Sequence, residues 1–254
     1  MRLRVLGCSG GELPRHRTTC FLVDGALAID AGALTASLSL PQLLKVDDIV
    51  LTHSHFDHVK DVPLLADLLV GQRRRPVRIH ASRGCARTLR ESVFNGQLWP
   101  DFTRIPDRRR PVIEIVPFEA RGSFRVGRYT FRPVPVHHPV ESVGFTISDG
   151  RATIGISGDT GPTDAFWRAV NACPRISALL VELSFPSSLQ GLADVSGHLT
   201  PRTLRDELRK LERNGFPVLL YHCKPAHLAE LRRELGAMRL AHVRVLRQGE
   251  AFVF

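Results

Sequence analysis

The stretch IVLTHSHFDHVKDVPLL, residues 49–65, places three histidines and an aspartate within six residues, directly after an apolar run. His53 and His55 alternate, so in an extended segment both side chains point the same way. Asp57 and His58 follow at once. A loop at the end of a buried strand can direct several side chains at one point, and α/β proteins commonly build sites there. Imidazole and carboxylate ligands suit zinc, and this spacing can serve two adjacent metals.

The composition is that of an ordinary globular protein. Of 254 residues, 43% are hydrophobic and 24% are charged, which suits one large α/β domain or two small ones. The five cysteines are scattered, odd in number and without a CxxC pair, which favours reduced thiols over a disulfide framework. No apolar run approaches the roughly 18–20 residues that span a bilayer. We therefore expect a cytoplasmic protein without a membrane segment.

The chain is strongly basic, with a net charge of +10. Only four of its 35 basic residues are lysines, so 31 are arginines, and many of these fall in two runs, RRRPVR at 73–78 and DRRR at 107–110. A solvated face or a loop edge is the simplest interpretation of such runs. The charge is compatible with a nucleic acid or an anionic substrate, but it establishes neither.

Short β-branched or apolar segments alternate with helical patterns along the chain. Strands are predicted at 2–6, 19–23, 26–30, 49–52, 77–80, 112–116, 130–136, 143–148, 152–156, 178–182, 218–221 and 242–245. Helices are predicted near 61–70, 82–93, 162–172, 201–213 and 226–235. Pro162 and Pro201 are expected at first helical positions, where a missing N–H costs nothing. No linker or repeat divides the sequence, so we expect residues 1–254 to form one domain with helices covering stacked sheets.

The motif HSHFDH at 53–58 resembles the HxHxDH signature of the metallo-β-lactamase superfamily of binuclear metallohydrolases. This resemblance implies an α/β fold, the four-layer αβ/βα sandwich, and further ligands at the ends of later strands. It implies two metal ions per chain, which we expect to be Zn²⁺, with Mn²⁺ as the alternative. The implied ligand set is His53, His55 and His138 on one metal, Asp57, His58 and His222 on the other, and Asp159 bridging them.

Two positions near this set stay open. The segment FRPVPVHHPVESVGF (131–145) ends a strand with two histidines, and HPVESVGF resembles the ribonuclease Z branch of the superfamily. That resemblance favours His138 as the ligand and makes His137 its neighbour. Asp30, in ALAIDAG, ends another strand. It either supports a ligand imidazole by a hydrogen bond from behind or simply terminates its strand in a turn.

Two further residues are not needed for the metals: Glu182 in VELSFP (181–186) and His198 in SGHLTP (196–201). A carboxylate beside an imidazole raises the pKa of that imidazole and favours its protonated form. Such a histidine can donate a proton to an oxyanion leaving group. We expect His198, oriented by Glu182, to be this acid; the alternative is a loop histidine before a helix.

The segment VFNGQLWPDF (93–102), together with GCSGG near the start and HCKP near the end, is similar to the class II 3′,5′-cyclic-nucleotide phosphodiesterases. The similarity implies that Trp99 and Phe102 form a wall facing the nucleobase, unless they are core residues, and that Asn95 is a polar contact. Phe56 followed by VKDVP departs from the commoner first motif, which has Leu and then Gly. That departure changes the expected pocket floor but not the metal geometry.

These expectations describe a binuclear metal-dependent phosphodiesterase that hydrolyses cyclic AMP or cyclic GMP through metal-activated water. Its catalytic residues are Asp57, His198 and Glu182. The expected partners are a small anionic cyclic nucleotide and a second copy of the chain in a homodimer; nucleic acid is not favoured. One alternative is a ribonuclease Z-like endonuclease acting on tRNA 3′ ends, although the long basic arm of that enzyme is not evident. The other is a non-catalytic binding module, which would not need seven ligands.

Overall fold

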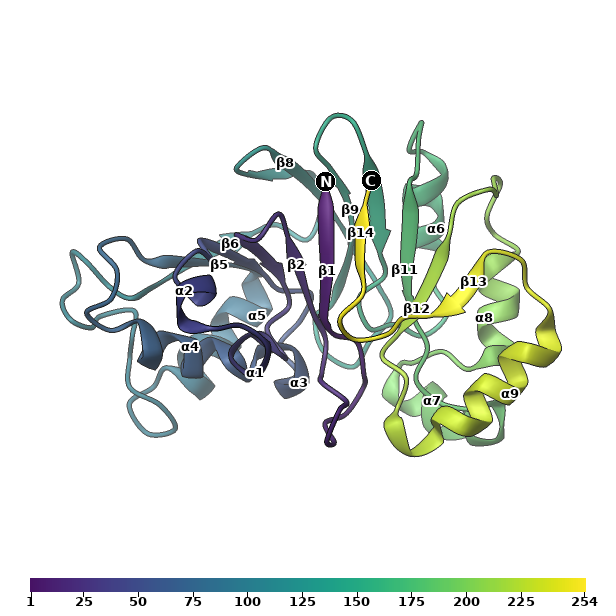
Figure 1. The fold of residues 1–254 in the computed structure, drawn as a ribbon, viewed down its shortest axis with the longest axis horizontal. Coiled ribbons are helices and arrows are strands. Elements are labelled where there is room, and N and C mark those ends of the chain that lie inside the picture. Colours follow the sequence, from purple (N-terminus) through teal and green to yellow (C-terminus); the bar gives the residue numbers. More distant parts are fainter.

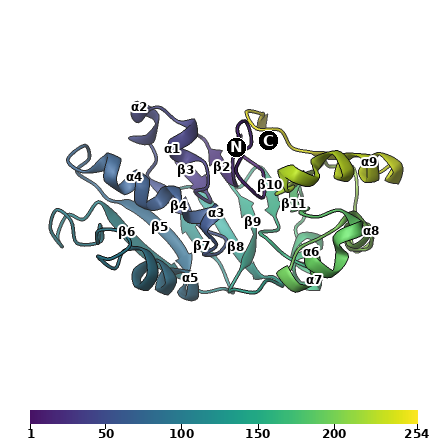
Figure 2. The same ribbon diagram turned by 90° about the horizontal axis from the view of Figure 1, so that it is seen from below.

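Two β-sheets pack face to face in the middle of the molecule, and helices cover their outer faces. The computed structural model describes residues 1–254. Figure 1 shows the N-terminal helices on the left, the C-terminal helices on the right and the strands between them, and Figure 2 shows the same layers from below. This arrangement is the four-layer αβ/βα sandwich that the sequence predicts.

The first sheet contains seven strands in the order β14-β1-β2-β3-β4-β5-β6. From β3 to β6 the strands are parallel, whereas the pairs from β14 to β3 are antiparallel. Its strands are β14 (Ala251–Val253), β1 (Arg2–Gly7), β2 (Cys20–Val23), β3 (Leu27–Ile29), β4 (Asp48–Val50), β5 (Val77–Ser82) and β6 (Ile113–Phe118). The helices beside it are α1 (Leu34–Ser37), α2 (Leu40–Leu43), α3 (Phe56–Val59), α4 (Asp61–Leu69) and α5 (Arg83–Thr88), which continues as a π-helical turn, Leu89–Val93.

The second sheet also contains seven strands, in the order β13-β12-β11-β10-β9-β8-β7. Here β10 to β13 are parallel and the pairs from β7 to β10 are antiparallel. Its strands are β13 (Val243–Val245), β12 (Val218–Tyr221), β11 (Ala178–Glu182), β10 (Thr153–Ile156), β9 (Val143–Ser148), β8 (Tyr129–Pro135) and β7 (Phe124–Val126). Its helices are α6 (Asp164–Asn171), α7 (Gln190–Ser196), α8 (Pro201–Leu208) and α9 (Leu228–Met238), with 3₁₀ turns at Ser187–Leu189 and Pro225–His227.

Three apolar cores hold these layers together. The central core joins the inner faces of both sheets and includes the buried rings of Phe21, Phe131 and Phe145. A second core lies between the first sheet and its helices, and a third lies under α6, α8 and α9. Because side chains alternate across a strand, each sheet can contribute to two cores at once, which is why both strand faces are apolar.

Most predicted elements are present, and most of their boundaries lie within two residues of the predicted ones. Thr200 caps α8 and Pro201 is its first residue, as predicted, but α8 ends at Leu208 rather than 213. The prediction for Pro162 is wrong, because α6 begins at Asp164 with Thr163 as its N-cap. The predicted helix 82–93 is an α-helix followed by the π-helical turn. The sequence analysis missed β7, β14, α1, α2, α3 and α7, which are all of seven residues or fewer.

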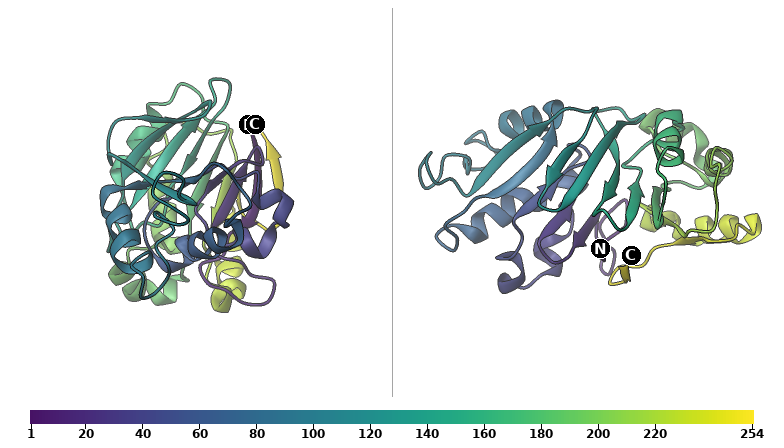
Figure 3. Two further views of the ribbon diagram at one scale, coloured as in Figure 1. Left: turned by 90° about the vertical axis from the view of Figure 1, so that its left-hand side faces the viewer. Right: turned by 90° about the horizontal axis from the view of Figure 1, so that it is seen from above.

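The chain ends lie side by side. β14 pairs with β1, and the Met1 amino group donates to the Phe254 carbonyl at 3.1 Å. Figure 3 shows both ends meeting at the same edge of the first sheet. Among the helices, none has the length and apolar character to cross a membrane.

Candidate metal centre

The histidine motif lies where the carboxyl ends of strands from both sheets meet. Val50 ends β4, and the loop after it carries His53 before His55 caps α3. From the second sheet, His138, Asp159 and His222 follow β8, β10 and β12, strands that run in the same direction. Two backbone hydrogen bonds join the edges: Val143 donates to the Thr52 carbonyl at 3.1 Å and His222 to the Cys8 carbonyl at 2.7 Å.

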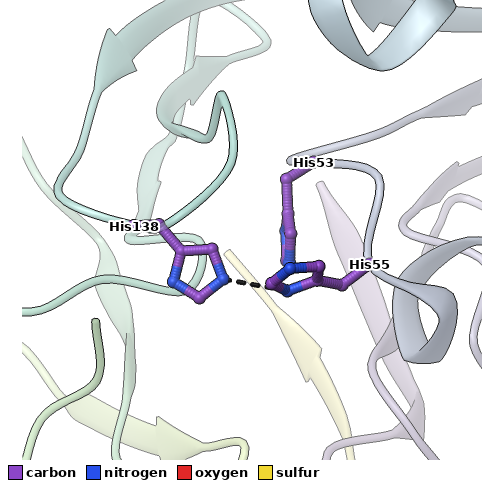
Figure 4. Close-up of side chains that lie close together, drawn as sticks. All are labelled: His53, His55 and His138. Carbon is purple, nitrogen blue, oxygen red and sulfur yellow. Dashed lines mark hydrogen bonds between the residues drawn. The ribbon is translucent and has the colours of Figure 1, made fainter. Parts of the chain in front are cut away.

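The seven expected ligands come together as two adjoining groups. One group is His53, His55 and His138, whose ligand atoms lie within 4.8 Å of one another, and Figure 4 shows the three rings converging. The other is Asp57, His58 and His222, again within 4.8 Å. Asp159 lies between them: its Oδ2 is 3.0 Å from His222 Nε2, 3.2 Å from His58 Nε2 and 3.9 Å from His53 Nε2. This is the grouping that the resemblance implies.

Four of the histidines are fixed from behind by hydrogen bonds at Nδ1. His58 Nδ1 bonds Asp30 Oδ2 at 2.8 Å, which is the first of the two roles that the sequence left open for Asp30, and Asp30 also accepts from Thr52. The other three bonds join His53 to Thr52 Oγ1 (3.0 Å), His138 to the Gly197 carbonyl (3.0 Å) and His222 to Ser184 Oγ (2.9 Å). An Nδ1 that donates outward leaves the Nε2 lone pair facing inward, as a metal ligand requires.

The atoms facing the centre fit a metal site. His53 Nε2, His58 Nε2 and Asp159 Oδ1 are buried and have no hydrogen-bond partner in the protein. Buried polar atoms without a partner are rare, because each costs roughly 1–3 kcal/mol. Nitrogen and carboxylate oxygen atoms converging in this way form a donor set suited to zinc or manganese.

The protonation of these groups follows from burial and from their neighbours. Burial lowers the pKa of His53 well below its usual value. Burial also acts to lower the pKa of His58, but the carboxylates of Asp159 and Asp30 outweigh it and raise that pKa well above the usual value. For Asp159, burial raises the pKa, yet His222 and His58 together hold it well below the usual range. The ionised carboxylates attract positive charge to the centre, which divalent cations can supply.

His137 and His138 occupy different surroundings. His138 is half-buried, and its Nε2 lies 3.0 Å from His55 Nδ1. His137 is exposed, and no possible metal group includes it. Gly197, whose carbonyl accepts from His138 Nδ1, adopts a left-handed conformation (φ 65°), and a Cβ there would lie 3.0 Å from His138 Cα. The geometry therefore favours the assignment of His138 that the sequence analysis preferred.

Glu182 and His198 lie together beside the cluster. His198 Nδ1 is 3.3 Å from Glu182 Oε1, and the His198 ring stacks on His222 with centroids 5.2 Å apart. Burial lowers the pKa of His198, but Glu182 outweighs it and raises that pKa above its usual value. The N–H of Leu199 also donates to Glu182 Oε1 at 2.8 Å, which fixes the carboxylate to the loop that carries His198.

Ser184 is a site residue that the sequence analysis missed. Its hydroxyl donates to Glu182 Oε2 at 2.9 Å and lies 3.1 Å from His198 Nδ1 and 2.9 Å from His222 Nδ1. One buried hydroxyl thus joins the Glu182–His198 pair to a metal-facing histidine. Only the spacing to Glu182, two residues along an extended segment, could have suggested that both side chains point the same way.

The three residues expected to contact substrate are placed differently. Phe102 is 3% exposed and packs in the core under the first sheet, so the structure offers no free ring face there. Trp99 packs against the same core and is partly exposed. Asn95 is exposed, but its side chain closes a local turn by bonding the Glu91 carbonyl and the N–H groups of 97 and 98. Core packing and turn geometry therefore account for Phe102 and Asn95.

The position of Phe56 bears on the expected change in the pocket floor. The side chain of Phe56 is 67% exposed at the first position of α3, so it forms no part of a buried floor.

Comparison with known proteins agrees with this geometry. A sequence model described as "Beta-lactamase superfamily domain" matches residues 21–243. The chain belongs to the metallo-β-lactamase superfamily. A curated relative from Yersinia pestis, named a probable 3′,5′-cyclic-nucleotide phosphodiesterase, is 28% identical over 237 residues. That match covers 81% of this chain and 66% of the relative, so the chain spans slightly less than two thirds of the relative's length.

Several solved structures share the fold at low sequence identity. Unliganded yeast PDE1 superposes with a TM-score of 0.82 at 21% identity, covering 100% of this chain and 99% of that one. The short form of human tRNase Z gives a TM-score of 0.66 at 18% identity, with the same coverages. Because one fold hosts many chemistries, these likenesses support the architecture and leave the reaction to be argued from the site.

Proposed function

We propose that this protein is a metal-dependent phosphodiesterase that hydrolyses 3′,5′-cyclic nucleotides to 5′-nucleotides. The superfamily makes it a metallohydrolase, and the name of the Yersinia pestis relative points to this substrate class. We assign His53, His55 and His138 to one cation, Asp57, His58 and His222 to the other, and Asp159 to both. Zinc is the expected ion, because imidazole nitrogens dominate the donor set.

The observation that carries the proposal is the Glu182–His198 pair beside the ligand histidines. The ligand atoms of His138, Asp159 and His198 lie within 4.8 Å of one another, so a phosphate at the centre is within reach of His198. Glu182 is not among the seven ligands assigned above, although Glu182, His198 and His222 also lie close enough to form a possible metal group. The Glu182 carboxylate has a role in phosphodiester cleavage, where the departing oxygen needs a proton.

In the proposed reaction, each of these residues has a separate role. Bound divalent ions would supply Lewis acidity and lower the pKa of water towards ~7. The oxygen of water bonds to phosphorus as the water releases a proton to solvent, the bond from phosphorus to the 3′ oxygen breaks, and the 3′ oxygen takes a proton from His198. Nδ1 of His198 faces Glu182 and Ser184, which leaves Nε2 to carry the transferred proton.

Ser184 acts in this proposal as a positioning residue. Its single proton goes to Glu182, so its lone pairs accept from Nδ1 of both His198 and His222. The hydroxyl thereby fixes the tautomer of His222, whose Nε2 faces Asp57 and Asp159. One side chain in this way orients both the acid and a ligand.

The proposal is tested by assaying purified protein on cyclic AMP, cyclic GMP, other cyclic phosphates and bis-p-nitrophenyl phosphate, with and without chelator. We expect cyclic-nucleotide hydrolysis that chelator abolishes and added zinc or manganese restores, with about two ions bound per chain by elemental analysis. Full activity in metal-free protein would exclude the assignment. Cleavage of a precursor tRNA with no action on cyclic nucleotides would favour the ribonuclease Z alternative.

A further inference from the structure

The two arginine runs noted in the sequence converge on one cavity. The run at 73–75 lies in the connection from α4 to β5, and the run at 108–110 lies just before β6. β5 and β6 are parallel neighbours, with Val77 opposite Ile113, so both runs arrive at the amino ends of adjacent strands. Together they line a concavity of about 290 Å³ with Arg73, Arg74, Arg75 and Arg110 on its walls. We call this concavity the arginine notch; the helices and loops next to β5 and β6 are on the left-hand side of Figure 1.

The notch is far from the candidate metal centre along the sheet. His53, His55 and His58 follow the carboxyl end of β4, which is parallel to β5, whereas the notch is at the amino end of β5 itself. β5 has six residues, and a strand rises about 3.3 Å per residue, so roughly 17–20 Å of sheet separates its two ends. A ligand in the notch is therefore outside the centre.

The charges in the notch are mostly uncompensated. Arg74, Arg75 and Arg110 form no ion pair with any carboxylate of the chain. The one acidic residue on the wall, Asp107, accepts backbone N–H groups from Arg109 and Arg110 through Oδ1 and so organises its own loop. Like charges held together repel one another, and an anion that enters the notch relieves that repulsion.

One wall of the notch is fixed in place. The guanidinium of Arg73 bonds the Val46 carbonyl and pairs with Asp47, and its side chain is 11% exposed. Three prolines, at 76, 106 and 111, restrict the backbone of the two loops around it. Leu69 and Val112 form an apolar base, and no aromatic side chain lines the cavity. A ligand is therefore recognised by its charge and shape, without stacking of a base.

We propose that the arginine notch binds an oligophosphate group, that is, two or more linked phosphates. Guanidinium groups match phosphate oxygens with paired N–H donors, and several arginines on two loops suit a chain of phosphates better than a single monovalent anion. The chemistry is the same whether the phosphates belong to a free oligophosphate or to the backbone of a polynucleotide. The site is independent of the proposed phosphodiesterase activity.

The test compares two triple variants with equal loss of charge. The notch variant is R74Q/R75Q/R110Q, which spares Arg73 because that side chain holds Val46 and Asp47. The control variant is R151Q/R168Q/R239Q, three exposed arginines that form no ion pair and lie on other elements. Binding of tripolyphosphate to metal-loaded protein is measured by calorimetry at low salt, and both variants are checked for the wild-type melting temperature and zinc content.

We expect the notch variant to bind tripolyphosphate about 100-fold or more weakly than wild type, since each charge-assisted contact is worth about tenfold or more. The control variant should bind within about twofold of wild type, and orthophosphate should bind wild type far more weakly than tripolyphosphate. Equal losses in the two variants, or no binding by the wild type, would overturn the proposal. Competition by a single-stranded oligonucleotide would identify a polynucleotide as the source of the phosphates, and absence of competition would identify a free oligophosphate.

Discussion

The two ends of the parallel strands in the first sheet carry polar clusters of different construction. At the carboxyl ends, where the second sheet adds His138 and His222, the histidines are largely buried, and four of them have a hydrogen-bond partner on the side away from the centre. At the amino ends of β5 and β6, the arginines are mostly exposed, and three of the four that line the notch have no ion-pair partner. The first cluster is built from many segments, and the second from two neighbouring loops.

This difference separates two ways of binding charge. A metal ion needs several lone pairs aimed at one point, so each ligand must be held by a second residue. A phosphate chain is bound by positive charge in a concave place, and long arginine side chains can adjust to it. Substitutions at the centre should therefore have large effects that depend on the exact atom replaced. Substitutions in the notch should weaken oligophosphate binding and leave metal binding unchanged.

The largest expected effect is at the metal ligands. His138→Ala should lose metal and reduce hydrolysis of cyclic nucleotides to background, because it removes a ligand whose Nε2 faces the centre. His137→Ala, its matched control one residue away, should retain both. Elemental analysis and a steady-state assay on the same preparations measure the two outcomes. The reverse pattern would mean that the ligand lies one residue earlier in the chain.

A smaller and more selective effect is expected at the proton donor. His198→Ala should keep both metals yet slow cleavage of a cyclic nucleotide by about 10²–10⁴-fold, the usual contribution of a positioned acid. The same variant should lose far less on bis-p-nitrophenyl phosphate, whose leaving group hardly needs a proton. Glu182→Gln should give a milder version of this pattern. Equal losses on both substrates would assign His198 to binding or structure instead.

The smallest of the three effects is expected at Ser184. Ser184→Ala should weaken zinc affinity by about 10–100-fold, because His222 loses the partner that fixes its tautomer. Ser184→Thr keeps the hydroxyl and should recover most of that affinity, and Ser196→Ala, which removes an exposed helical hydroxyl, should change nothing. Competition with a zinc indicator measures the affinity separately from the rate. If the Ser184→Ala protein has a lower melting temperature but binds zinc with the wild-type affinity, the hydroxyl has a purely structural role.

How well the sequence predicted the molecule depended on how local the signal was. Apolar runs in the sequence predicted the strands 143–148, 178–182 and 218–221. The pair Thr200-Pro201, an N-cap followed by proline at the first helical position, predicted the start of α8. Of the short strands that were missed, β14 pairs with β1 at the opposite end of the chain, so nothing near it in the sequence signals a strand. β7 forms a hairpin with the next strand, β8, and its three residues were overlooked beside that longer strand. The role of Phe102 was also beyond local sequence signals, because an aromatic residue in a loop can equally line a pocket or pack in a core.

At the metal centre, the sequence by itself determined that four side chains lie close together, because six consecutive residues span only a short distance. These are His53, His55, Asp57 and His58. The resemblance added His138, Asp159 and His222, each expected at the end of a later strand. Only the tertiary structure decided which nitrogen of each imidazole faces inward, since that depends on partners such as Asp30, Gly197 and Ser184 from separate segments. Likewise, two arginine runs more than thirty residues apart became a single notch only because β5 and β6 pair in parallel and bring their amino ends together.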